Sequence, residues 1–186
     1  GPSGLEAARV LAERGHEVTV FEASSTVGGQ LSLAALAPRR RDLQGIVDWR
    51  SQELARLGVE VRLNTFADAD TVLEGGFDIV IVATGGIPKS PDVPGSHLVV
   101  DTWDVLSGAR RPSGHVLVYD DHGGTQALDA VEALLRTGCS VDLVTPERTV
   151  APDVGGLLAS YYFAAMAEGG VRIVPLRRLV SVEKLA

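Results

Sequence analysis

The chain contains the segment Gly15-His16-Glu17-Val18-Thr19-Val20-Phe21-Glu22 and repeats it in diverged form as Gly138-Cys139-Ser140-Val141-Asp142-Leu143-Val144-Thr145. The two segments align without a gap, and each follows a stretch with the apolar periodicity of a helix. A glycine that closes a helix and an apolar run typical of a strand are two parts of a βαβ unit. The sequence therefore predicts two βαβ units from two nucleotide-binding-type domains.

Apolar periodicity predicts the other helices and strands of both units. The expected helices cover residues 6–13, 42–57 and 126–137, and the expected strands cover 17–21, 59–63, 79–82, 116–119 and 141–144. The strand over 79–82 is apolar at every position, which is typical of a parallel strand covered on both faces. We predict an α/β fold of two Rossmann-like, doubly wound parallel-sheet units, each a three-layer sandwich. The first domain covers 1–110 and lacks its first strand, and an incomplete second domain covers 111–186.

Composition and charge exclude several classes of protein. The 186 residues are 45% hydrophobic and carry a formal net charge of −7, which argues against a nucleic-acid partner or an anionic membrane, because phosphate groups require a basic surface. No apolar run approaches the roughly 18 to 20 residues that cross a bilayer. The single cysteine cannot form an intrachain disulfide, and the usual Cys/His metal-site spacings are missing. We expect a cytoplasmic protein without a metal site in this chain.

The first residues match part of a dinucleotide-binding motif. Gly1-Pro2-Ser3-Gly4 corresponds to the last four positions of a G-x-G-x-x-G turn, in which Gly1 admits a diphosphate and Gly4 lets the helix pack closely. Glu22 ends the next expected strand, where a carboxylate can accept both hydroxyls of an adenosine ribose. The alternative is a glycine turn in an ordinary α/β unit with an exposed glutamate. Since the strand before Gly1 would be central in the sheet, we expect the chain to be a piece of a longer polypeptide.

Several motifs occur in an order that resembles a known family. They are Gly1-Pro2-Ser3-Gly4-Leu5-Glu6-Ala7-Ala8-Arg9-Val10-Leu11, Val20-Phe21-Glu22, Val27-Gly28-Gly29-Gln30-Leu31, Asp48-Trp49-Arg50, Gly58-Val59-Glu60-Val61 and Val82-Ala83-Thr84-Gly85-Gly86. Together they resemble the C-terminal flavin/dinucleotide region of the trimethylamine dehydrogenase and 2,4-dienoyl-CoA reductase family. Members of this family carry an N-terminal (β/α)₈ barrel with FMN, a four-iron four-sulfur cluster, and then this region.

The resemblance implies binding roles for ten residues. Gly1, Gly4 and Glu22 would hold the ADP half of FAD, or ADP alone. The turn made of Gly28, Gly29, Gln30 and Leu31 would pass close to the diphosphate or flavin. Ala83, Thr84 and Gly85 would form the second flavoprotein fingerprint, at the carboxyl end of a strand, where ligands of open α/β sheets bind. Without the resemblance, a loop that needs positive φ is the better explanation of Gly28 and Gly29.

The corresponding turn of the second unit, before the helix over 126–137, has lost motif glycines. Counted from the preceding strand, the three motif positions are Asp120, His122 and Thr125, and all three glycines are lost. Counted back from the helix, the positions are His122, Gly124 and Ala127, and only the first glycine is lost. The sequence leaves both registers open.

The charges of this second turn also differ from those of a dinucleotide-binding turn. In either register Asp120 and Asp121 are expected at the lip of the turn, where two carboxylates repel a diphosphate. Thr145 takes the place of the ribose-binding acid. We therefore expect NAD(P) not to bind here, as in the amine dehydrogenase branch, although Arg148 favours the 2′-phosphate of NADP.

These observations predict an FAD- or ADP-binding region of a flavoprotein oxidoreductase closer to the amine dehydrogenase branch. No residue of the chain is expected to be catalytic, because the resemblance places FMN, the iron-sulfur cluster and the substrate outside it. The resemblance also implies electron transfer to a separate acceptor protein and a homo-oligomer in the full-length form. Two alternatives stay open: an NAD(P)H-dependent enoate or 2,4-dienoyl-CoA reductase, and a non-catalytic nucleotide-binding module.

Overall fold

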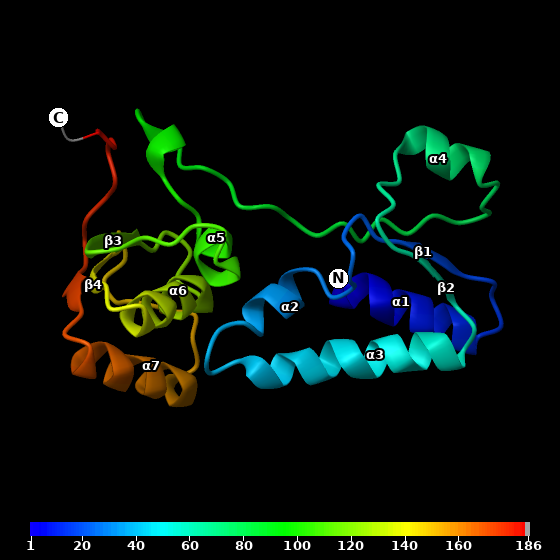
Figure 1. Ribbon diagram of the computed structural model, residues 1–186, viewed down its shortest axis with the longest axis horizontal. Helices are drawn as coiled ribbons and strands as arrows, with labels where there is room; N and C mark the ends of the chain where they lie inside the picture. Colours follow the sequence, from blue (N-terminus) through cyan, green and yellow to red (C-terminus); the bar gives the residue numbers. More distant parts are fainter. Residues whose placement is uncertain (185–186) are drawn as a thin grey trace. The chain divides into compact units, whose positions relative to one another are not determined.

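The computed structural model describes residues 1–184 and contains two compact α/β units (Figure 1). Unit 1 consists of Gly1–Ala35 and Arg39–Ile87, and unit 2 consists of Leu36–Pro38 and the described residues from Pro88 onward. The two parallel sheets agree with the predicted α/β class. The division into nucleotide-binding-type domains at 1–110 and 111–186 stays a prediction.

Unit 1 is a two-stranded parallel sheet with helices beside it. Its elements are α1 (Pro2–Glu13), β1 (Thr19–Phe21), α2 (Gln30–Ala34), the 3-10 helix η1 (Arg41–Leu43), α3 (Gln44–Arg56), β2 (Glu60–Arg62) and α4 (Ala69–Glu74). Thr19 pairs with Glu60 in the sheet, and α1 and α3 lie side by side along it (Figure 1). The core between them contains Leu5, Ala8, Val47 and Leu54, because the apolar positions of each helix recur on one face.

Unit 2 is a three-stranded parallel sheet in the order β3-β4-β5. Its elements are the 3-10 helix η2 (Ser96–Leu98), α5 (Thr102–Ser107), β3 (His115–Tyr119), α6 (Thr125–Arg136), β4 (Ser140–Val144), α7 (Gly156–Glu168) and β5 (Arg172–Val174). In α6, apolar side chains at helical spacing, including Leu128, Val131 and Leu134, form the core with Leu143 and with Tyr162 of α7.

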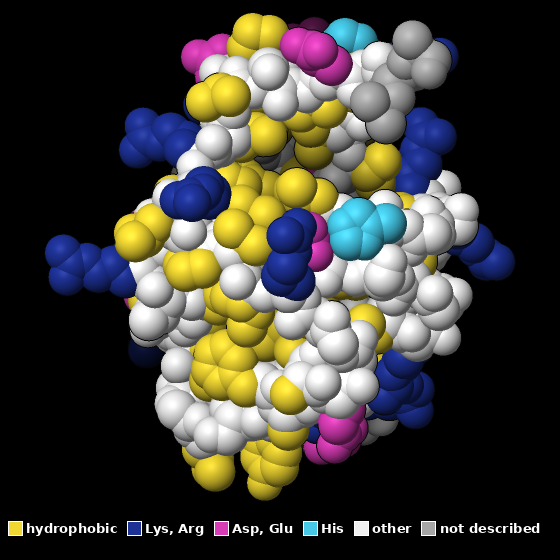
Figure 2. Space-filling view, turned by 90° about the vertical axis from the view of Figure 1, so that its left-hand side faces the viewer, with side chains coloured by type: hydrophobic (Ala, Val, Ile, Leu, Met, Phe, Trp, Pro, Cys, Tyr) yellow, Lys and Arg dark blue, Asp and Glu magenta, His cyan; other side chains and the backbone are white. Residues whose placement is uncertain are grey.

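The strands of unit 2 also carry side chains that do not belong to this core. In β3 burial alternates along the strand, so that Val118 is buried whereas Leu117 is 57% exposed. Figure 2 views the molecule from the side of unit 2 and shows hydrophobic side chains at the surface among basic ones. Leu117 lies opposite Asp142 in the sheet, and Asp142 lies opposite Arg172. This row of β3, β4 and β5 therefore combines an apolar side chain with an ion pair.

The internal repeat predicted from the sequence is confirmed by matching geometry at the two helix ends. Gly15 and Gly138 have φ angles of 86° and 85°. The residue after each glycine donates its backbone N–H to the carbonyl four residues before that glycine, at 3.1 Å in both units. A glycine with positive φ thus closes α1 and α6 in the same way and turns the chain into β1 and β4.

The match continues through the following strand pair. Glu22 donates its N–H to the carbonyl of Arg62 at 3.0 Å, and Thr145 donates to the carbonyl of Val174 at 3.2 Å. The pair β1-β2 therefore corresponds to β4-β5. Unit 2 has β3 on the other side of β4, whereas β1 pairs with β2 alone among the described residues.

The prediction of a strand over residues 79–82 is wrong. These residues form no strand, and their apolar side chains are exposed, with Ile79 at 77% and Val82 at 80%. A strand exists only where a neighbouring strand pairs with its backbone, and within the described part of the chain no strand lies in the position next to β1 that β3 takes next to β4. The apolar run is present in the sequence, but no strand among residues 1–184 pairs with it.

One prediction concerns the acid stability of unit 2. Asp142 is 6% exposed and accepts a hydrogen bond from Arg172 Nε at 3.0 Å, while His115 Nε2 lies 3.4 Å from Asp142 Oδ2. The hydrogen bond from the Arg172 guanidinium holds the pKa of the Asp142 carboxyl below its usual value. A lowered native pKa stabilises the fold above the unfolded-state pKa, and this contribution is lost as the pH falls through the native pKa.

Wild type is therefore expected to unfold at a higher temperature than Asp142→Asn near neutral pH. The difference should shrink as the pH falls from about 5 to below about 3.9, the ordinary aspartate pKa, because the unfolded carboxyl takes up its proton there and the native carboxyl only at lower pH. Thermal unfolding of both full-length proteins across this range measures it. A difference that does not change with pH would contradict the ion pair as its source.

Candidate nucleotide-binding site

The site is built around the N-terminus of α1. Gly1 is the N-cap, and Pro2 is the first helical residue, a position where proline is favoured because its missing N–H would have no partner. The carbonyl of Gly1 accepts the first helical bond, from Leu5 N at 3.1 Å. No side chain caps this end. The free N–H groups and the helix dipole make it suited to an anion such as a diphosphate.

Glu22 lies next to this helix end because it follows β1 directly. Its Oε2 atom is 3.8 Å from the Gly1 nitrogen, and its Oε1 atom accepts a hydrogen bond from Ser24 N at 2.9 Å. The side chain is 17% exposed. One carboxylate oxygen is thus held by the following turn, while the other faces the start of α1 at the carboxyl edge of the sheet.

The turn before α2 approaches the same point. Gly28 and Gly29 have φ angles of 118° and 54°, so the positive-φ loop considered for them in the sequence is real. A Cβ atom on Gly29 would lie 3.1 Å from the Cα atom of Gly1, and one on Gly28 would lie 2.1 Å from Ser32 Oγ. Both glycines are therefore favoured by their positive φ, and Gly29 is favoured also by its close approach to Gly1. Leu31 packs against the core of unit 1.

The segment Ala83–Gly86 also lies close to the start of α1. A Cβ atom on Gly4 would lie 3.2 Å from the Cβ atom of Ala83. Gln30 Nε2 donates a hydrogen bond to the carbonyl of Gly86 at 2.8 Å, and the position of a Cβ on Gly85 is 3.4 Å from the same nitrogen. Thr84 is exposed. The structure therefore brings segments with all ten predicted residues together within unit 1; their contact with a nucleotide stays a prediction.

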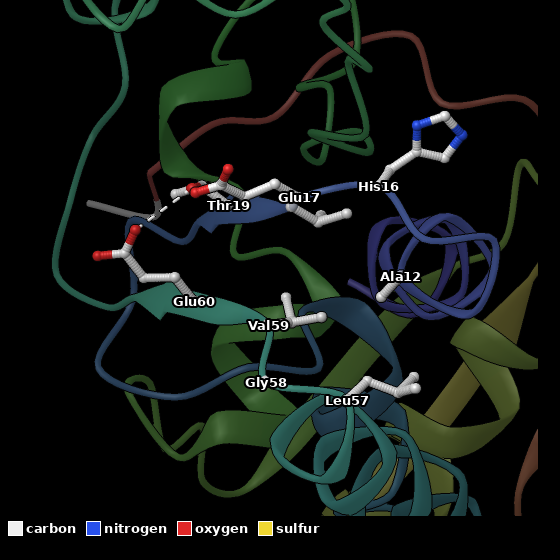
Figure 3. Close-up of a pocket in the computed structure, with 9 residues that line it drawn as sticks. Ala12, His16, Glu17, Thr19, Leu57, Gly58, Val59 and Glu60 are labelled. Atoms are coloured by element: carbon white, nitrogen blue, oxygen red, sulfur yellow. Dashed lines mark hydrogen bonds between the residues drawn. The ribbon is translucent and has the colours of Figure 1, made fainter.

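Two cavities of unit 1 do not coincide with this convergence. One, of about 190 Å³, lies at the amino ends of β1 and β2, where His16, Glu17, Thr19 and Glu60 line it (Figure 3). Ligands of open α/β sheets bind at the opposite edge, so this cavity has no place in the predicted site. The other, of about 450 Å³, is mainly apolar and lies between α3, β2 and the loop 25–27. None of the ten predicted residues lines it, and on α1 it is lined by Leu5.

The turn between β3 and α6 resolves the register that the sequence left open. Gly124 is the N-cap of α6 and corresponds through the repeat to Gly1, the N-cap of α1, so Ala127 corresponds to Gly4. The register counted back from the helix is therefore correct. The placement of Asp120 at the lip was wrong: its side chain is 2% exposed, because it folds under the turn and accepts hydrogen bonds from the turn's own N–H groups. Asp121 is exposed.

A sequence profile described as "Pyridine nucleotide-disulphide oxidoreductase" matches residues 1–186. The chain belongs to this family. Its similarity to the probable N-methylproline demethylase of Rhizobium meliloti (strain 1021) is 44% identity over 99% of this chain and 27% of that protein. The N,N-dimethylglycine/sarcosine dehydrogenase of Chromohalobacter salexigens is 44% identical over 90% of this chain and 25% of that protein. The chain thus spans about a quarter of the length of these relatives.

A solved structure shares the fold of this chain. The 6-hydroxypseudooxynicotine amine oxidase of Pseudomonas geniculata N1 superposes with a TM-score of 0.88 and is 33% identical, over 98% of this chain and 29% of that one. These relatives confirm the predicted resemblance to the amine dehydrogenase-like branch. Membership in the pyridine nucleotide-disulphide oxidoreductase family identifies the chain as a flavin- or nucleotide-binding region of an oxidoreductase.

Two further findings concern the part of the chain that the structure describes. Within residues 1–184, no helix combines the length and the apolar character that crossing a membrane requires. Over the same residues, no group of three or more His, Cys, Asp or Glu side chains is arranged to hold a metal ion.

Proposed function

We propose that the chain is the FAD- or ADP-binding region of an amine dehydrogenase-like flavoprotein. The observation that carries the proposal is the convergence of Gly1, Glu22 and Gly29 at the uncapped N-terminus of α1. A helix N-terminus with close-approaching glycines suits a diphosphate, and a carboxylate beside it suits a ribose.

Each group has a separate task in this proposal. The first N–H groups of α1 bind the diphosphate, and the absence of side chains at Gly1 and Gly29 lets it approach the backbone. The Oε2 atom of Glu22 accepts the ribose hydroxyls, while Ser24 holds the other oxygen in place. The segment Ala83–Gly86 packs against the helix start and orients the far half of the ligand. When FAD is bound, its isoalloxazine supplies redox chemistry that no side chain of this region can supply.

The substrate is proposed to react outside this chain. The names of the two relatives that are 44% identical describe oxidation or demethylation of N-methylated amines, and we extend this class of substrate to the full-length protein. FMN and a four-iron four-sulfur cluster in the remaining part, an electron-accepting partner protein and a homo-oligomeric form belong to the same proposal. No residue of residues 1–186 is assigned a catalytic role.

A second candidate is an NAD(P)H-dependent reductase of unsaturated acids or their thioesters. It is favoured by relatives that are named as reductases, including a bilirubin reductase that is 33% identical and a cinnamate reductase that is 32% identical. The two candidates differ in the compound that reduces the flavin.

Absorbance of the full-length protein tests the proposal. Bleaching of the flavin band by a secondary or tertiary N-methylamine, but not by NADPH, is the expected result. Bleaching by NADPH alone would favour the reductase over the dehydrogenase as the function of the full-length protein. Acid extraction followed by chromatography identifies the nucleotide, and the absence of both FAD and ADP from a folded protein would overturn the assignment of this region.

A further inference from the structure

The turn between β3 and α6 in unit 2 is occupied by a side chain of the protein itself. Asp120 Oδ1 accepts hydrogen bonds from His122 N at 3.2 Å and Gly123 N at 2.9 Å. The side chain is 2% exposed, and its Oδ2 atom is buried without a hydrogen-bond partner. A buried carboxylate oxygen without a partner is costly, so the carboxylate is held there by its bonds to the turn. Two backbone donors of the turn are thereby already used.

A loop closes the same turn from the other side. Asp153 donates its backbone N–H to the carbonyl of Gly123 at 3.1 Å. A Cβ atom on Gly123, which has a φ of 78°, would lie 3.0 Å from Pro152 Cγ and 3.6 Å from the Asp153 carboxylate. The pyrrolidine ring and a second acidic side chain thus lie against the turn.

The internal repeat shows that this loop replaces the glycine turn of unit 1. Val154 N donates to the carbonyl of Ala151 at 3.1 Å, as Leu31 N donates to that of Gly28 at 3.2 Å. Ala151 therefore corresponds to Gly28, and the next residue, Pro152, corresponds to Gly29. Where unit 1 has two glycines beside the helix start, unit 2 has bulkier residues.

The position that would bind the ribose is also less suited to a nucleotide in unit 2 than in unit 1. Thr145 corresponds to Glu22 and is fully buried, with its Oγ1 accepting a hydrogen bond from Glu147 N at 3.2 Å. This bond repeats the one that Glu22 accepts from Ser24 N. Thr145 has no second oxygen to offer a ribose, whereas Glu22 has one.

We propose that Asp120 is a built-in substitute for the diphosphate of a dinucleotide, and that Asp120 and Pro152 together determine that unit 2 rejects NADH and NADPH. The carboxylate takes the turn's donors and brings negative charge to its centre, and the Pro152 ring covers its outer side. The turn keeps its folded shape because it carries its own anion. This inference concerns unit 2 and does not depend on which nucleotide unit 1 binds.

The test is a fluorescence or calorimetric titration of the full-length protein with NADH and NADPH. Wild type is expected to show no saturation up to about 1 mM, and the double variant Asp120→Gly/Pro152→Gly is expected to bind at least about tenfold more tightly, with a measurable Kd. Asp121→Gly is the matched control, because it removes an adjacent, exposed carboxylate that makes no bond in the turn; it should leave binding unchanged.

Asp120→Asn separates occupation of the turn from simple charge repulsion. The amide has the shape of the carboxylate and an oxygen that accepts from the same N–H groups, so it should still exclude the nucleotide. If Asp120→Asn binds NADH or NADPH as well as the double variant does, occupation is not the cause and the proposal fails.

Binding of NADPH to the wild-type protein can also overturn the proposal, even if the double variant does not fold. Saturation of the wild-type protein by NADPH at micromolar concentration, lost in Arg148→Ala, would overturn the proposal, because the 2′-phosphate would then have a functioning site in unit 2. Retention of FAD or ADP in that experiment would show that unit 1 had kept its assigned role.

Discussion

Gly4→Val is expected to abolish binding of ADP or FAD to the full-length protein. A Cβ atom at Gly4 already lies 3.2 Å from the Cβ atom of Ala83, and valine adds two methyl groups beyond that atom. The segment Ala83–Gly86 must then move away from the first turn of α1, where the diphosphate is proposed to bind. Nucleotide released by acid from the purified protein, measured by chromatography, should fall below detection.

Gly45→Val is the matched control for this substitution. Gly45 also lies in the first turn of a helix, α3, but nothing is within 4 Å of the position of its Cβ atom. The control should keep its nucleotide, because a side chain at this position meets no neighbouring atom and valine is a slightly better helix former than glycine. Retention of cofactor by Gly4→Val through purification would count decisively against the proposed site.

Glu22→Ala is expected to weaken binding of ADP or FAD about ten- to a hundredfold. Loss of a hydrogen bond to a charged group costs roughly 1.5 to 3 kcal/mol, which corresponds to that range of affinity. The carboxylate faces Gly1 at 3.8 Å from its nitrogen, so it is placed beside the proposed diphosphate site. Titration of the cofactor-free full-length protein with ADP measures the change.

Glu17→Ala controls for the change of net charge. Glu17 precedes β1 at its amino end and lines the cavity at the opposite edge of the sheet (Figure 3). Its removal should leave the affinity for ADP unchanged. Equal affinities of wild type and Glu22→Ala would remove Glu22 from the site.

The repeat and the helix ends could be predicted because their signals are local. Gly15 and Gly138 each follow one amphipathic helix, and the bond that closes that helix joins residues only a few positions apart. The helix predicted over 6–13 occurs as Pro2–Glu13, and the one over 126–137 occurs as Thr125–Arg136. Apolar spacing and the backbone freedom of glycine determine both features without long-range contacts.

The prediction over 79–82 was wrong because a strand depends on a distant partner. Its run of apolar, β-branched residues is typical of a buried strand, but backbone hydrogen bonds to a neighbouring strand decide whether one forms. Among residues 1–184 that neighbour is missing from the sheet of unit 1. Hydropathy alone carries no information on this pairing.

The sequence by itself determined that two βαβ units follow each other, that a helix follows the glycine turn at Gly1, and that Glu22 comes at the end of the next strand, directly after Phe21. Only the tertiary structure decided that Gly29 approaches Gly1, and that Asp120 is buried beneath its turn instead of standing at the lip. The physical reason is the range of the forces involved. Periodicity and φ preferences act between neighbours in the chain, whereas close approach and burial depend on segments that only folding brings together.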